Sequence, residues 1–339
     1  MKHTIIYSLI FVILFSSCSE NEQKEKKIGK DEIAELHKLS IEEITQLIRQ
    51  EPKNSVLYDV RSDLYLQKGL VDSAIHSLEL AISIDSLEST YLLKLSELYL
   101  RNRGQSQKTK DLLEKCIRLF PKNVEAHINL ANLNFYVRQY SEALALLDRV
   151  KEIDKYNPHQ YYTRGLIYLE TGDTAKALAN FQTTVEMEAS YYDAHIQLGL
   201  IFAYLGDSIA LQYYRNAINL VPESIQAYYN MAMFYHDAGN VAKALETYNK
   251  LIEIDNEYYP AYHNIGYLYL YTRDFNKAIE YFTKAIEINH FYFQAFLHRG
   301  ICYEELKDKE KAREDFNTCL ELMPNYEPAL AGLNRLDNI

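Results

Sequence analysis

The chain has 339 residues, of which 48% are hydrophobic and 24% are charged. This ordinary globular composition excludes a disordered tail, a collagen-like rod and a multi-span membrane protein. The formal net charge of −11 argues against a nucleic-acid partner, because phosphate binding needs a basic surface. Four cysteines are too few and too scattered for a disulfide scaffold or a zinc site. Only 11 Gly and 7 Pro favour helices joined by short turns.

The first residues have the pattern of a targeting segment. Lys2 precedes an apolar run at residues 5–15, which is well short of the roughly 20 residues of a membrane-spanning helix. Residues 14–18, LFSSC, resemble the bacterial lipobox, with a phenylalanine at the usual aliphatic position. The resemblance implies a signal peptide over residues 1–17 and a lipid on Cys18. The alternative is an ordinary cleaved signal peptide with an incidental cysteine.

Residues 18–30 are polar and charged, and they contain too little apolar surface to fold. We expect this segment to be a flexible tether. The lipid would place the protein in the cell envelope, anchored to a membrane. We favour the outer membrane, and the sequence does not decide between its periplasmic side and the cell surface.

From residue 55 the sequence repeats at intervals of 33 to 35 residues. The segment YHNIGYLY at residues 262–269 recurs as YYNMAMFY at 228–235 and as FLHRGICY at 296–303. An alanine and, four residues later, an aromatic residue follow each copy: Ala244 and Tyr248, Ala278 and Phe282, Ala312 and Phe316. This pattern resembles the tetratricopeptide repeat (TPR) family, with Tyr, Phe or His in place of the usual Trp. The resemblance implies an all-α fold, an α-solenoid in which helix pairs form a right-handed superhelix.

We predict eight repeats over residues 55–324. Their approximate ranges are 55–88, 89–123, 124–157, 158–191, 192–224, 225–258, 259–292 and 293–324. A solenoid exposes half of its core at each end unless it is capped. We therefore expect an N-terminal helical cap over residues 31–54, with one helix from Asp31 to Arg49, and a C-terminal capping helix over 325–339. Repeats and caps are expected to form one continuous superhelix.

Small residues at fixed positions of the repeat predict how its helices pack and where they end. Glycines such as Gly266 and Gly300 should let the two helices of a repeat approach closely. A second set of glycines sits where the first helix of a repeat ends, and we expect a left-handed conformation there. These are Gly69, Gly172, Gly206 and Gly239.

The sequence has no glycine-rich phosphate loop, no G-x-S-x-G and no H-E-x-x-H. We predict no catalytic residue, no cofactor, no metal site and no enzyme activity. His236, His263 and His298 fall on the inner face of consecutive first helices, where a metal site is the alternative to histidines in a polar groove. Cys302 and Cys319 are expected to be structural thiols, with a disulfide between them as the alternative.

In the TPR family the first helices line a concave groove, and one inward position has a polar side chain in repeats three to eight. A column of amides can donate to and accept from an extended peptide backbone. It resembles the asparagine ladder of O-GlcNAc transferases and kinesin light chains, although Asn is also simply common at this position. The predicted groove residues are Asn129, Asn132, Tyr136, Tyr162, Thr163, Gln197, Tyr204, Tyr229, Asn230, His263, Asn264, Tyr267, Tyr271 and His298. We expect the strongest binding at repeats six and seven.

Charges at the inward positions are mostly acidic, and they include Asp237, Glu304 and Glu305. The family's carboxylate-binding clamp needs basic residues at positions that are uncharged here. A neutral or basic extended segment of a partner protein is therefore the expected ligand.

Together these features predict a non-enzymatic envelope lipoprotein. It would act as an adaptor or scaffold that binds extended peptide segments in the concave groove, for assembly or secretion of envelope components. The alternative is a structural spacer or oligomerisation module that uses its convex or terminal surfaces.

Overall fold

The structure is a computed structural model that describes residues 29–101 and 105–337. All regular secondary structure in these two ranges is α-helical. No helix within them is both long enough and apolar enough to cross a bilayer. Cys18 and the predicted signal peptide lie outside the described residues.

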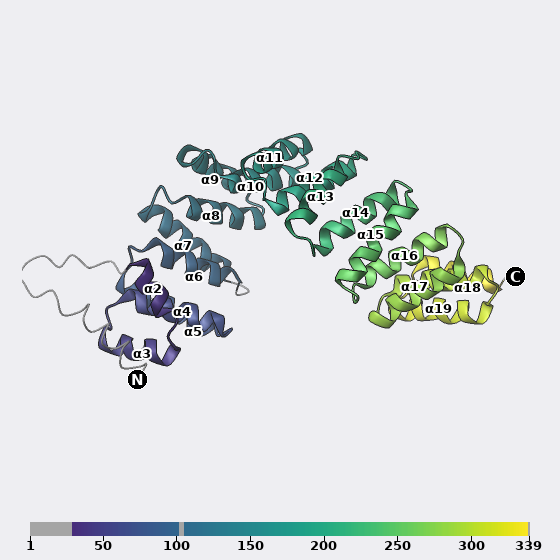
Figure 1. Cartoon of the computed structure of the whole chain (residues 1–339), viewed down its shortest axis with the longest axis horizontal. Helices are drawn as coiled ribbons and strands as arrows, with labels where there is room; N and C mark the ends of the chain where they lie inside the picture. Colours follow the sequence, from purple (N-terminus) through teal and green to yellow (C-terminus); the bar gives the residue numbers. More distant parts are fainter. Residues whose placement is uncertain (1–28, 102–104, 338–339) are drawn as a thin grey trace, which may run out of the picture. The chain divides into compact units, whose positions relative to one another are not determined.

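Nineteen helices follow one another in the described part of the chain (Figure 1). They are α2 (Lys30–Leu36), α3 (Ile41–Gln50), α4 (Ser55–Gln67), α5 (Val71–Ile84), α6 (Ser89–Arg101), α7 (Ser106–Leu119), α8 (Val124–Tyr136), α9 (Tyr140–Ile153), α10 (Pro158–Glu170), α11 (Thr174–Met187), α12 (Tyr192–Tyr204), α13 (Ala210–Leu220), α14 (Ile225–Asp237), α15 (Val241–Ile254), α16 (Tyr259–Tyr271), α17 (Phe275–Ile288), α18 (Phe293–Glu305), α19 (Lys309–Leu322) and α20 (Glu327–Asp337).

Helices α4 to α19 form eight consecutive pairs between Ser55 and Leu322. The two helices of a pair pack against each other, as α10 does with α11 and α16 with α17. Within each unit the second helix then packs against the first helix of the next pair, as α5 does with α6 and α17 with α18. This succession is the all-α solenoid that the repeats predict.

The chain divides into two compact units, one up to Ala126 and one from His127 onward. Each unit is a stack of helix pairs with its own buried residues. A single continuous superhelix stays a prediction. The second unit contains all of the predicted groove residues.

The N-terminal cap differs from the prediction of one helix. Residues 37–40 separate α2 from α3, because Ser40 starts a new helix. The Ser40 hydroxyl accepts a hydrogen bond from the Glu43 amide at 3.2 Å, and the Glu43 carboxylate accepts one from the Ser40 amide at 2.8 Å. This reciprocal capping box satisfies amides that an unbroken helix would have bonded internally. At the other end, α20 forms where the capping helix was predicted.

In several repeats the contact between the two helices places a glycine against an aromatic ring. A Cβ atom on Gly266 would lie 2.8 Å from the Phe282 ring, and one on Gly300 would lie 2.8 Å from the Phe316 ring. Both rings are fully buried. The small residue therefore fixes how closely the helices pack, as the repeat pattern predicts.

In seven of the repeats the turn between the two helices is described and uses the left-handed conformation. All four predicted glycines adopt it, with φ between 69° and 83°. Arg138, Arg273 and Lys307 occupy the matching positions in other repeats with φ of 61°, 62° and 67°. Side chains with a Cβ are strained in this region by about 1–2 kcal/mol. Stacking of the repeats holds these three turns in a shape that glycine adopts more easily.

Cys116, Cys302 and Cys319 are buried free thiols. The alternative of a bridge between Cys302 and Cys319 is therefore wrong for this structure. Burial raises the pKa of Cys302 to about 12, so this group is a neutral thiol at ordinary pH. These cysteines pack as small apolar residues in the core.

Candidate protein-binding face

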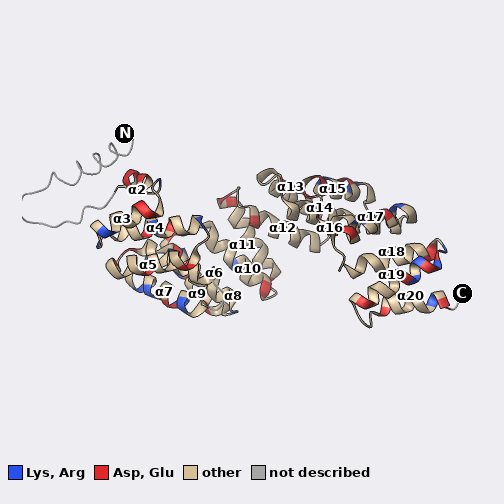
Figure 2. Ribbon diagram, turned by 90° about the horizontal axis from the view of Figure 1, so that it is seen from below, with Lys and Arg blue, Asp and Glu red and all other residues tan. Residues whose placement is uncertain are grey.

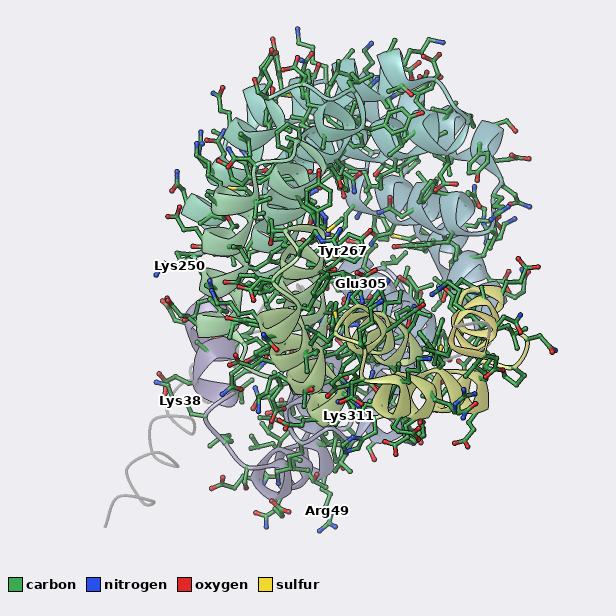
Figure 3. The ribbon with its side chains drawn as sticks, turned by 90° about the vertical axis from the view of Figure 1, so that its right-hand side faces the viewer. Lys38, Arg49, Lys250, Tyr267, Glu305 and Lys311 are labelled. Carbon is green, nitrogen blue, oxygen red and sulfur yellow. The ribbon has the colours of Figure 1, made fainter. Side chains whose placement is uncertain are left out.

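The inward positions of the first helices α8, α10, α12, α14, α16 and α18 define what we call the inner face of the second unit. Neighbouring first helices meet there, since α12 contacts α14 and α16 contacts α18. The ribbons of α14 and α16 have few charges, whereas α19 shows both signs (Figure 2). In Figure 3, Tyr267 on α16 lies toward the centre of the view, while Lys250 on the second helix α15 points outward at its edge.

Three predicted tyrosines are largely exposed on this face. Tyr136, Tyr204 and Tyr271 are 73%, 88% and 74% exposed, and each is the last residue of its helix. Large aromatic side chains left in solvent at one repeated position are available to a partner, and tyrosine combines an apolar ring with a hydroxyl. Tyr267 is 40% exposed, whereas Tyr162 and Tyr229 are partly buried.

The other three first helices of the inner face end in an acidic residue at the same position. They are α10, α14 and α18, and their last residues are Glu170, Asp237 and Glu305. Tyrosine and carboxylate thus alternate from repeat to repeat along one edge of the inner face. A carboxylate is unfavourable at a helix C-terminus, because it faces the negative end of the helix dipole.

Asn264 is held inside the structure. Its amide donates to the Tyr248 hydroxyl at 3.1 Å and lies 3.4 Å from the Tyr229 hydroxyl. Tyr248 is fully buried, and Tyr229 belongs to the preceding first helix. This amide therefore links two repeats, and a ligand would have to break these hydrogen bonds to use it.

Two more side chains of the predicted column also form contacts with a neighbouring repeat. The Thr163 hydroxyl is buried and donates to the Asn132 side-chain oxygen at 2.9 Å. Gln197 interacts with the hydroxyl of Tyr162, which comes from the preceding repeat. Both contacts join consecutive first helices, so these groups stabilise the stack.

Asn129 and Asn230 differ from the rest of the column. Both are half-buried, and neither makes a hydrogen bond to any residue that the structure describes. Ile196 occupies the position on α12 that Tyr229 occupies on α14, so one of the two hydroxyls that Asn264 contacts has no counterpart beside Asn230. Tyr214, the counterpart of Tyr248, lines the same space as Asn230 without forming a hydrogen bond to it. Their amides can therefore bond to a peptide backbone without a competing internal contact.

His263 and His298 form a buried pair between α16 and α18. His263 Nε2 lies 2.9 Å from His298 Nδ1, and the Tyr292 hydroxyl lies 3.3 Å from His263 Nδ1. The pKa of both histidines is lowered to about 4, by burial in each case and, for His298, also by the proximity of His263. Both imidazoles are neutral at ordinary pH and act as a polar contact between repeats.

The pair does not extend to a third ligand. His236 packs against the Tyr267 ring, with its Nδ1 atom buried and without a hydrogen-bond partner. Within the described residues, no three His, Cys, Asp or Glu side chains gather as a metal site would require. The histidines of this face are accounted for as packing and hydrogen-bonding groups.

A pocket of about 390 Å³ opens on the inner face between α12 and α14. It is lined by Leu200, Ala203, Tyr204, Gly206, Tyr214, Asn230, Met233, Phe234, Asp237 and Ala238. We call it the α12–α14 pocket. It brings together an exposed tyrosine, a free amide and a carboxylate of the predicted site.

The acidic character of the inner face is smaller than the sequence suggests. Arg335 on α20 binds both carboxylate oxygens of Glu304 at 2.7 Å, and Arg273 pairs with Glu305 at 3.1 Å. Counting these two residues as free negative charge was wrong, because their partners come from elements far along the chain. Asp237 has no ion-pair partner among the described residues. Its unpaired carboxylate is therefore the main reason to expect a cationic ligand.

The first unit shows the same neutralisation. Lys94 lies 2.7 Å from Asp59 and 2.9 Å from Asp63, and His37 of the cap lies 3.0 Å from Asp63. Lys94 comes from the next repeat, and His37 is the residue that follows α2. These acids therefore fasten neighbouring elements together and leave little free negative charge.

Family models described as Tetratricopeptide repeat match five stretches of the chain. The matched residues are 56–86, 90–123, 162–208, 223–289 and 293–326. These stretches fall on the helix pairs described above.

Two relatives illustrate the range of similar proteins. A BBSome complex member, the BBS4 homolog of Drosophila melanogaster, is 27% identical over 175 residues, which are 51% of this chain and 36% of that protein. The photosystem I assembly protein Ycf3 of Cyanophora paradoxa is 32% identical over 117 residues, which are 33% of this chain and 68% of that protein. The chain thus spans about a third of the first relative and two thirds of the second.

A solved structure shows the same fold at low identity. The C-terminal part of a TPR repeat-containing protein from Cytophaga hutchinsonii aligns with a TM-score of 0.61 and 19% identity. The alignment covers 73% of this chain and 99% of that one. At this identity the likeness concerns the fold alone.

Proposed function

Because this chain belongs to the tetratricopeptide repeat family, whose members mediate protein–protein interactions, we propose that it is a non-enzymatic adaptor that binds an extended segment of a partner protein on its inner face. The α12–α14 pocket is the observation that carries the proposal. There Tyr204 is 88% exposed, and Asn230 has a free amide. An extended strand could pack on the ring and bond to the amide through its backbone.

The available groups favour an extended ligand over a folded one. Tyr136, Tyr204 and Tyr271 recur once in every second repeat, so a partner that contacts more than one of them must run along the stack. An extended chain advances about 3.3 Å per residue and can follow such a series. Elsewhere on the inner face, Asn264 and the histidine pair are already bonded between repeats and are not available to a ligand.

We further propose that Cys18 anchors the adaptor in the cell envelope, where it would serve assembly or secretion of envelope components. The support is the LFSSC sequence at residues 14–18 and the polar segment that follows. Replacement of the cysteine, Cys18→Ala, should move the protein from the membrane to the soluble fraction. Retention of a labelled lipid by this variant would refute the anchor.

Affinity capture from detergent-solubilised envelope tests the adaptor. The bait is residues 19–339, compared with the same bait carrying Asn129→Ala and Asn230→Ala. We expect a partner that the first bait retains and the second loses, because the second lacks the two free amides. Asn264→Ala is the matched control, since it removes the same side chain at the same repeat position but one already bonded internally.

The outcome also separates the adaptor from a structural spacer. A partner that both baits retain equally would place the contact on the convex or terminal surfaces, and the inner-face proposal would fail. Loss of the partner with Asn264→Ala alone would likewise contradict the assignment of the free amides as the binding groups.

A further inference from the structure

We propose that the α12–α14 pocket receives a lysine or arginine side chain of the bound segment. The inference rests on the proposed binding of an extended segment, and it names the residue type that this part of the inner face recognises. A basic segment is the occupant that the charge of the pocket favours.

The lining of the pocket is suited to both parts of a basic side chain. Leu200, Met233 and Phe234 offer apolar surface for the aliphatic stem, which Lys and Arg commonly bury while their charge stays near water. Tyr204 and Asp237 border the same space. The tyrosine ring attracts a cation over its face, and the carboxylate accepts its hydrogen bonds.

Asp237 is the one charged residue among the ten that line the pocket. It also ends α14, where the dipole of the helix adds negative potential. Two unfavourable features thus coincide in the unbound protein: a carboxylate at a helix C-terminus, and no Lys, Arg or His of the described residues within ion-pair distance. A ligand cation would relieve both.

Glu305 provides an internal comparison. It ends α18 at the same position of its repeat, and there the chain itself supplies the cation, since Arg273 pairs with it at 3.1 Å. The Arg273 guanidinium also lies 5.5 Å from the centre of the Phe275 ring. An arginine held by a carboxylate and close to an aromatic ring is therefore an arrangement that this protein already uses. At the α12–α14 pocket the carboxylate and the ring are present, and the partner would supply the cation.

Asn230 lies in the same pocket and gives the side chain a defined direction. Its free amide can hold the peptide backbone while the basic side chain enters between α12 and α14. A volume of about 390 Å³ accommodates a side chain together with adjacent backbone atoms.

Peptide titration tests the proposal on the full chain in detergent. The chain contains no Trp, so the fluorescence of a Trp at one end of a short synthetic peptide reports binding alone. The central residue is arginine, lysine or citrulline, which has the shape of arginine without its charge. We expect the arginine and lysine peptides to bind roughly tenfold more tightly than the citrulline peptide.

The variant Asp237→Asn should reduce this preference to less than about twofold, and Tyr204→Leu should weaken binding of the arginine peptide by several fold. Glu305→Gln removes the same charge at the matched position and should leave the preference unchanged. If Glu305→Gln reduced the preference for the charged peptides as much as Asp237→Asn does, the preference would come from the overall negative charge of the inner face, and the proposed pocket would be wrong. Equal binding of arginine and citrulline peptides would overturn it as well.

Failure of this inference is distinguishable from failure of the proposed function. If all three peptides bind equally and Asn230→Ala weakens the binding of each, the inner face binds peptides but the pocket does not distinguish charged from neutral side chains. If the partner captured from the envelope is retained by the variant lacking both free amides, the proposed function itself fails.

Discussion

Replacement of two asparagines by alanine should have opposite effects, although the two occupy the same position in adjacent repeats. Asn264→Ala removes an amide that donates to the buried Tyr248 hydroxyl at 3.1 Å and approaches Tyr229. A lost hydrogen bond of this kind costs about 1–2 kcal/mol. For a unit of this size that lowers the Tm by roughly 2–8 °C. Asn230→Ala removes an amide with no partner in the described structure and should shift the Tm by less than about 1 °C.

Thermal unfolding followed by circular dichroism measures the first effect, and capture of the partner well below the Tm measures the second. We expect Asn264→Ala to be destabilised but to keep its partner. Asn230→Ala should keep its stability and bind more weakly. Equal destabilisation of the two variants would show that the hydrogen bonds of Asn264 do not link the repeats. Stability unchanged in both would refute the distinction between engaged and free amides.

Three further predictions concern stability. The pKa of about 4 for His263 and His298 lies below the unfolded value of about 6.5, so the unfolded state takes up protons first. The free energy of unfolding should therefore fall by on the order of a few kcal/mol as the pH drops from about 6.5 toward 4. With both histidines replaced by Gln, the free energy of unfolding measured with urea should depend less on pH over this range. Lys307→Gly should stabilise by up to about 1 kcal/mol, because glycine adopts the left-handed turn without strain; a lower Tm would contradict this. Gly266→Ala should destabilise by about 1–3 kcal/mol through overlap with the Phe282 ring, and an unchanged urea midpoint would show that the ring can move away.

The fold could be predicted because one packing rule recurs in every repeat. A small residue faces a large buried side chain, as Gly266 faces the Phe282 ring, and this leaves a pattern at a fixed interval that defines the helix pairs. The N-terminal cap does not share this rule. There a local capping box at Ser40 decided where one helix ended and the next began.

The binding face could be predicted only in part, because availability depends on the neighbouring repeat. Asn230 and Asn264 are equivalent in the sequence pattern, yet only Asn264 bonds to hydroxyls of the preceding repeat, those of Tyr229 and Tyr248. The charge of Glu304 was overestimated for the same reason, since Arg335 reaches it from the terminal helix.

Site-specific photo-crosslinking tests the central claim most directly. A photoreactive phenylalanine replaces Tyr204 on the inner face or, as control, Lys250, which points outward from α15 (Figure 3). Irradiation in the envelope should join the partner to the Tyr204 position and not to the Lys250 position. Crosslinking from Lys250 with none from Tyr204 would contradict binding on the inner face and assign the interaction to the outer helices.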